Sequence, residues 1–194
     1  MSHFSVAVFT KTVFEKPSDE LKKLKEELEL FKNIFPWKDY WDKEEQLYEK
    51  EFGKMDKEVM ERTLKYLEYG VSDKTDVFLK ENNYLEWKVD EDEEDGGYFT
   101  NPNSFWDWFK IGGRWGDIAK EIHYKKIKDI PIDSILEYFY GFVDLDNKYH
   151  SKGEMWWWGI NDATDESSKE FDDKLIQYIK ENPDLYILVV DYHV

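Results

Sequence analysis

Two short apolar runs, one near each end of the chain, constrain the fold more than any other feature. Phe4–Phe9 and Leu185–Val190 are rich in β-branched and aromatic residues, a composition typical of buried strands. Apolar residues recur at helical spacing in the segments between them. We therefore predict an α+β fold, in which a mixed or antiparallel sheet contains both terminal strands and is packed with amphipathic helices mainly on one face.

Helical periodicity and capping residues predict three helices. The first is expected over residues 18–35 and the second over residues 55–69, each followed at once by proline or glycine. The third is expected to begin near Ser167, which has the spacing of a capping box with Glu170, and to end before Pro183.

A hairpin is predicted in the second half of the chain. Tyr138–Leu145 and Tyr149–Trp158 are strand-like runs, and Asp146-Asn147 lies between them as the turn. Gly153 is a position where a bulge can interrupt the second run.

Six consecutive acidic residues form the most charged stretch of the sequence. Such a block repels itself, so we expect an extended, mobile loop that marks an internal boundary and offers a surface to a partner. The whole chain, 1–194, is interpreted as a single α+β domain with a helical segment over about 18–70 and an acidic loop over about 90–97. The candidate partner-binding residues are Asp90, Glu91, Asp92, Glu93, Glu94 and Asp95.

Charge and composition exclude several classes of protein. The net charge is −17, from 44 acidic and 27 basic residues, so direct binding to a nucleic-acid backbone is disfavoured and partners are expected to be cationic or neutral. The chain has no cysteine, which excludes disulfides and cysteine-ligated zinc. Neither a signal peptide nor a membrane-spanning run is present in the sequence, and no cofactor motif is recognised, so we expect a cytoplasmic protein without a cofactor.

Three titratable residues are predicted to meet at the chain ends. Asp191 and His193 are two positions apart on a strand and therefore project from the same face. If the terminal strands pair antiparallel, His3 lies beside them. Such a cluster can bind a divalent metal, or a carboxylate in it can orient a histidine for proton transfer. The alternative is that these histidines are solvent-exposed strand ends. His123 and His150 have no partner at ligand spacing and are interpreted as surface residues.

The segment Asn101–Gly116 is a candidate binding site. It contains three tryptophans, two phenylalanines, three glycines and one arginine, which together offer stacking planes, tight turns and a planar cation. Its first aromatic residues, Trp106 among them, are more typical of a core, whereas Arg114 is expected to stack or to pair with a carboxylate such as Asp107. The candidate ligand-binding residues of this segment are Trp106, Arg114 and Trp115.

A second tryptophan-rich segment covers Gly153–Gly159. On a strand, Trp157 must point away from the face of its two tryptophan neighbours. A helix, a loop or a second subunit can cover it, or it can belong to a stacking pocket with Glu154 as an acceptor. Glu154 and Trp157 therefore complete the set of candidate ligand-binding residues.

Four segments, in this order, resemble a family of bacteriophage proteins that has no established activity: Met1–Val6, Trp106–Trp115, Gly153–Gly159 and Val189–His193. The chain departs from the family at two positions, with a serine at position 5 in place of threonine and a tyrosine at position 192 in place of cysteine. The resemblance implies a phage or prophage source, action inside an infected cell, and a site shared by the terminal histidines and the tryptophan segments.

Two hypotheses for function follow from the sequence. The first, which the charge favours, is an acidic binding protein that inhibits a host defence factor, of the anti-CRISPR or another anti-defence type, by occupying a basic surface that receives nucleic acid. The second is a protein that binds or hydrolyses a nucleotide-like small molecule with its tryptophans, Arg114 and the His3, Asp191 and His193 cluster. The second requires these residues to converge.

Overall fold

The structure is a computed structural model that describes residues 3–11, 26, 28–29, 43, 62, 65–67, 79–89, 96–153 and 162–193. Most of the predicted helices over 18–35 and 55–69 lies outside these residues, as do the acidic block and the second tryptophan segment beyond Gly153. No helix in the described ranges is long and apolar enough to cross a membrane.

The described elements are the strands β1 (His3–Thr10), β2 (Glu86–Val89), β3 (Gly97–Thr100), β4 (Trp108–Ile111), β5 (Gly141–Val143), β6 (Tyr149–Ser151) and β7 (Tyr186–His193), the helices α5 (Gly116–Ile122), α6 (Ile132–Tyr138) and α7 (Asp165–Glu181), and the short 3₁₀ turns η1 (Gly113–Trp115) and η2 (Ile127–Asp129).

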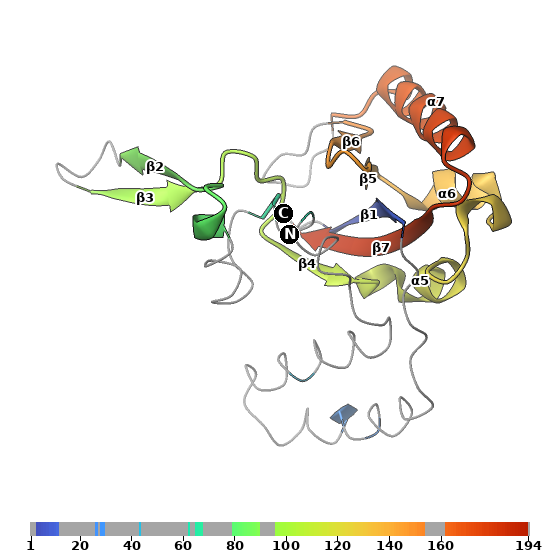
Figure 1. Ribbon diagram of the computed structural model, residues 1–194, viewed down its shortest axis with the longest axis horizontal. Coiled ribbons are helices and arrows are strands. Elements are labelled where there is room, and N and C mark those ends of the chain that lie inside the picture. The colour runs from blue at the N-terminus through green and yellow to red at the C-terminus, as the bar shows by residue number, and fades with distance from the viewer. Residues whose placement is uncertain are drawn as a thin grey trace.

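A five-stranded mixed sheet in the order β4-β7-β1-β5-β6 forms the centre of the molecule (Figure 1). β1 pairs antiparallel with β7 and parallel with β5, while β4 and β6 pair antiparallel with β7 and β5. The prediction of an α+β fold with both terminal strands in one mixed sheet is confirmed. The first and last segments of the chain are thus adjacent central strands.

Both faces of the central strands are covered, which differs from the expectation of one main covered face. On one face, Phe142 of β5 contacts Phe171 and Tyr178 of α7. On the other, Trp106 stacks on Tyr192 of β7 with the ring centroids 3.5 Å apart. Strands buried on both sides read as continuous apolar runs rather than alternating ones, and this explains the two terminal runs.

A buried arginine joins the chain around residue 62 to the sheet. The Arg62 guanidinium donates to the carbonyl of Phe9 at 3.0 Å, to the carbonyl of Asp144 and to the side chain of Asn147. Tyr66 donates to the carbonyl of Asn147 as well. These donors satisfy buried carbonyls at the end of β1 and in the turn between β5 and β6.

The predicted hairpin is present, but its first strand is shorter than expected. β5 and β6 pair through the turn at Asp146-Asn147, where Asn147 adopts a φ of 63°. Tyr138 belongs to the end of α6 and not to a strand. The prediction was wrong at this end because an apolar run of a few residues fits a buried helical turn as well as a strand.

The last helix begins three residues earlier than predicted. Thr164 is the N-cap: its hydroxyl accepts from the backbone N–H of Ser167, and the Ser167 hydroxyl accepts from the backbone N–H of Thr164. Ser167 is therefore the N3 residue of the capping box and not its N-cap, so the predicted pairing of Ser167 with Glu170 is wrong. The helix buries Phe171, Leu175 and Ile179 against the sheet.

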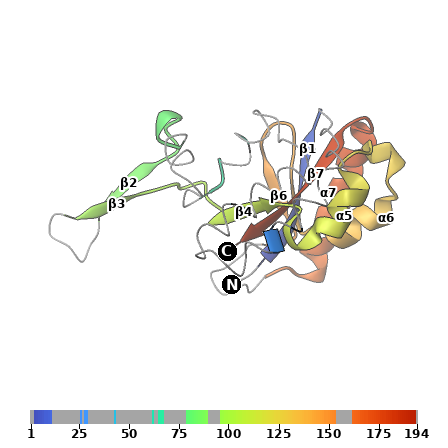
Figure 2. The same cartoon turned by 90° about the horizontal axis from the view of Figure 1, so that it is seen from below.

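β2 and β3 form a separate two-stranded ribbon that the sequence analysis did not predict. Both views show it extending away from the five-stranded sheet (Figures 1 and 2). Asn101, directly after β3, donates from its side-chain amide to the carbonyls of Lys65 and Leu67. Since Val89 pairs with Gly97, the acidic block joins two strands of one hairpin and is not a boundary between units.

His123 is fully buried at the end of α5, so its interpretation as a surface residue was wrong. Its Nε2 accepts a hydrogen bond of 2.8 Å from the backbone N–H of Val189. Burial lowers the pKa of His123 to about 3. The side chain is therefore neutral in the folded protein at neutral pH.

We predict that His123 makes the protein sensitive to acid. Below a pH of about 6.5 the unfolded chain takes a proton at this residue, whereas the folded chain does so only near pH 3, so stability falls as the pH falls through this window. The His123→Gln variant keeps an acceptor for Val189 but does not titrate. Urea unfolding at pH 7 and pH 4.5 should show that the wild type loses about 2 to 3 kcal/mol more than the variant. Equal losses in the two proteins would contradict the prediction.

Candidate functional site

The pairing of the terminal strands brings two histidines together. His3 of β1 lies opposite His193 of β7 in the register of the antiparallel pair. Directly opposed residues share one face of a sheet, and the two imidazole rings lie 5.0 Å apart between centroids at an interplanar angle of 79°. The sequence expectation that these residues meet is therefore met in the structure.

Asp191 is the buried carboxylate of the cluster. Its Oδ1 lies 2.9 Å from Nδ1 of His3, and its Oδ2 accepts a 3.0 Å hydrogen bond from the backbone N–H of Arg114. The residue is only 2% exposed. Both oxygens thus have partners, as a buried carboxylate requires.

Two glycines let the chain pass close to this carboxylate. Gly112 and Gly113 have positive φ angles of 69° and 46°, which glycine adopts without strain. A Cβ on Gly113 would lie 2.2 Å from Cβ and 2.3 Å from Oδ2 of Asp191. The glycine pair was expected to allow close approach to a ligand, and here it is the Asp191 side chain that the backbone approaches.

A second carboxylate holds the second histidine. Oδ2 of Asp107 lies 3.0 Å from Nδ1 of His193, and the backbone N–H of Asp107 donates to the carbonyl of His193 at 2.9 Å. Asp107 is thus the partner of His193 and not, as the sequence suggested, the partner of Arg114. The cluster consists of two aspartate–histidine pairs side by side.

Trp108 fixes the orientation of both rings. It stacks on His193 with the centroids 4.8 Å apart and the planes at 12°, and it meets the edge of His3 at 5.4 Å. Trp108 follows Asp107 at the start of β4, which pairs with the end of β7. The first residue of β4 and the residue before it therefore supply the aromatic wall and the carboxylate of His193.

This arrangement leaves the same nitrogen available on each ring. Nδ1 of both histidines faces a carboxylate, while Nε2 of neither contacts another polar atom of the described residues. An imidazole held at Nδ1 by a carboxylate presents a basic Nε2 to a substrate or a metal ion.

The cluster is largely enclosed by the protein. The side chains of His3 and His193 are 12% and 7% exposed, and that of Asp107 is 36% exposed. The alternative that the terminal histidines are solvent-exposed strand ends is therefore wrong for His193. Asp107 is the most exposed of these three side chains.

The remaining candidate residues have different positions. Trp106 is 2% exposed and packs in the core, so its ring is covered by protein and does not offer a face to a ligand. Trp115 is half-buried against the core, and Arg114 is exposed. The structure does not describe Glu154, Trp157 or the acidic block, Asp90–Asp95.

Two residues of the cluster were not assigned from the sequence. Asp107 was considered for Arg114 and Trp108 was not considered for a role, because β4 and its register against β7 were not predicted. The signal that could have found them is the Trp-Asp-Trp order ahead of Ile111 and the glycine pair, which suits a short strand entering a tight turn.

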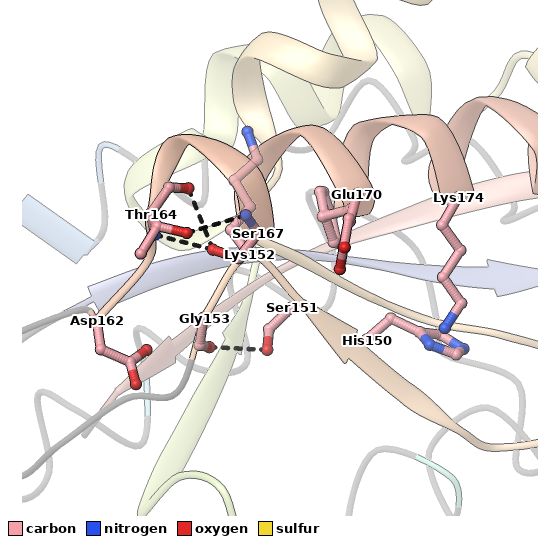
Figure 3. Close-up of a pocket in the computed structure, with 10 residues that line it drawn as sticks. His150, Ser151, Lys152, Gly153, Asp162, Thr164, Ser167, Glu170 and Lys174 are labelled. Carbon is pink, nitrogen blue, oxygen red and sulfur yellow. Dashed lines mark hydrogen bonds between the residues drawn. The ribbon is translucent and has the colours of Figure 1, made fainter.

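A third aspartate–histidine pair lies beside a surface hollow of about 450 Å³ (Figure 3). His150 of β6 contacts Asp144, with Nε2 2.8 Å from Oδ2, so its interpretation as an unpartnered surface residue was wrong. Burial lowers the pKa of His150, and Asp144 opposes this shift. Burial raises the pKa of Asp144, but hydrogen bonds from His150 and from backbone N–H groups outweigh it and hold that pKa below its usual value.

The hollow beside His150 carries charges of both signs. Lys152 and Lys174 lie on it together with Asp162 and Glu170 (Figure 3). Lys152 is 3.5 Å from Asp172 and so already has an acidic partner. The mixed charge does not single out a class of ligand, and the terminal cluster is the stronger candidate site.

Comparison of the chain with protein-family models, with curated proteins and with solved structures finds no match.

We predict that Gly113→Ala damages the cluster. The added methyl group collides with Asp191 and the backbone angle is unfavourable for alanine, so the free energy of unfolding should fall by about 2 to 4 kcal/mol. Gly116→Ala is the matched control, because Gly116 has a helical φ of −57° and should tolerate the methyl group. Urea unfolding of the two variants measures the difference, and similar stability in both would contradict the role of Gly113.

Proposed function

We propose that the protein binds a small molecule at the two aspartate–histidine pairs and moves protons on it, with His3 and His193 as base and acid. The observation that carries this proposal is the geometry of the pair: each Nδ1 faces a carboxylate and the two rings are 5.0 Å apart. A carboxylate at Nδ1 fixes the tautomer in which Nε2 is the base. One neutral and one protonated ring can take a proton from one atom of a ligand and return a proton to another.

Proton transfer is the chemistry that these side chains can perform by themselves. A metal site would need at least one further ligand, and among the described residues no group of three or more histidine, aspartate and glutamate side chains is placed to hold a metal ion. No cofactor is part of the proposal.

An anionic, nucleotide-like ligand fits the surroundings of the pair. The backbone N–H of Arg114 donates to Asp191. The guanidinium of the same residue is exposed and forms no ion pair with a described residue. A guanidinium recognises phosphate well. Because the whole chain carries a charge of −17, a small anion is favoured over a polyanion such as nucleic acid.

We predict that both imidazoles carry their proton on Nδ1 when neutral. Nitrogen-15 NMR of the histidine rings should show an unprotonated Nε2 on His3 and on His193 at high pH. Inorganic phosphate and a panel of nucleoside mono-, di- and triphosphates should shift these resonances. His3→Gln, His193→Gln and Arg114→Gln should each weaken binding of the active panel member at least tenfold, or about 1.4 kcal/mol.

His150→Gln is the control for these measurements. It also removes one imidazole from an aspartate–histidine pair, at Asp144, and should leave binding unchanged. The proposal fails if Nε2 is the protonated nitrogen, if no member of the panel shifts either ring, or if binding survives the loss of both histidines.

A second candidate function is supported by the charge of the chain. In it the protein acts in the cytoplasm of an infected bacterial cell, where it inhibits a defence protein with a basic, nucleic-acid-binding surface. The support is the net charge of −17 and the six consecutive acidic residues between β2 and β3 in the sequence, since acidic groups steer association with a basic surface.

We predict for this candidate that replacing Asp92, Glu93 and Glu94 with serine abolishes inhibition. The readout is the plating efficiency of a phage on cells that carry a nucleic-acid-targeting defence system and produce the protein. The control variant removes three negative charges elsewhere in the chain. It has serine at three exposed positions of α7: Glu166, Glu170 and Asp173. Equal loss in both variants, or no loss in either, would count against this function, and His3→Gln should retain inhibition.

A further inference from the structure

The β2–β3 ribbon is an isolated pair of strands with free faces. It forms a sheet of its own and extends away from the five-stranded sheet in both views (Figures 1 and 2). A two-stranded ribbon on its own is marginally stable in water and is usually retained where it packs against something. The side chains of the ribbon indicate which of its faces can pack against another surface.

One face of the ribbon is an aromatic and aliphatic surface. Trp87 lies opposite Phe99 and Val89 lies opposite Gly97, so these side chains share a face. Trp87, Val89 and Phe99 are 54%, 69% and 59% exposed. Large apolar side chains gathered in this way at the surface are typical of protein interaction sites. We call this set, Trp87, Val89 and Phe99, the ribbon face.

The ribbon face is held in a fixed arrangement. Trp87 and Phe99 meet edge to face, with centroids 5.0 Å apart. A Cβ on Gly97 would lie 2.4 Å from the Trp87 ring, so the indole lies against the backbone of β3 at this glycine. A rigid aromatic pair loses little conformational freedom on binding, which favours affinity.

The charge of the chain around this face selects the partner. The six acidic residues Asp90–Asp95 follow Val89 in the sequence, and Gly96 separates them from Gly97. We propose that the β2–β3 ribbon is a docking arm whose ribbon face enters an apolar groove of another protein, and that this partner is basic, because the chain carries a net charge of −17. A second copy of this chain is a poor occupant, because each copy carries a charge of −17 and like charges repel.

This inference is independent of the proton-transfer function. The ribbon face contains no residue of the histidine cluster, so variants on one surface test only that surface. The inference gives the second candidate function a contact surface, but it stands for any basic protein partner, whatever that partner does.

The test uses the full chain with the photoreactive amino acid benzoylphenylalanine in place of Phe99, produced in the native host cells. Tyr98 is the matched control position, since it is 54% exposed and lies on the opposite face of the same strand. The cross-linked protein is identified by mass spectrometry and then purified. Its affinity for the unlabelled chain is measured at about 0.1 M and at about 1 M salt. Over this range the Debye length falls from about 10 to about 3 Å, so electrostatic attraction is screened.

We expect position 99 to cross-link to a protein with a basic groove and position 98 to give much less product. Trp87→Ser and Phe99→Ser should weaken binding at least tenfold, Tyr98→Ser less than twofold, and high salt should weaken binding of the wild type. Circular dichroism of each variant checks that the fold is retained. The proposal is overturned if the cross-link joins two copies of this chain, if no product forms, or if both positions give equal amounts of product. It is also overturned if high salt does not weaken binding of the partner.

Discussion

The antiparallel pairing of β1 with β7 is the contact on which the rest of the structure depends. It places the first and last described strands at the centre of the sheet, where β5 adds to β1 and β4 adds to β7. The same register sets His3 against His193. Because the pairing joins segments that are far apart in the sequence, the core and the histidine cluster depend on the same long-range contact.

Burial of the Asp191 carboxylate connects the fold to the candidate site. An ionised group that leaves water must find hydrogen bonds, and Asp191 finds them in the His3 ring and in the backbone N–H of Arg114. Only a residue without a side chain fits at Gly113, where the loop meets the carboxylate. The contacts that satisfy the buried charge also fix the orientation of His3, so stability and function share the same atoms.

Sequence periodicity predicted the parts of the fold that depend on local pattern. The terminal strands, the turn at Asp146-Asn147 and the apolar face of α7 were found because each repeats a local rule of spacing or turn chemistry. Errors occurred where the pattern was short: Tyr138 ends a helix, Thr164 caps α7, and the four-residue strands were not predicted at all. A run of three or four residues fits several structures equally well, and tertiary contacts select one of them.

The sequence by itself determined that the chain is acidic, that it begins and ends in buried strands, and that Asp191 and His193 share a face with His3 once those strands pair. Only the tertiary structure decided which side chains surround these residues. His123 and Trp106 are buried, and Asp107 pairs with His193 rather than with Arg114. The ribbon face is exposed and lies outside the core. Burial and partner choice depend on which distant segments pack together, and spacing along the chain carries no record of that packing.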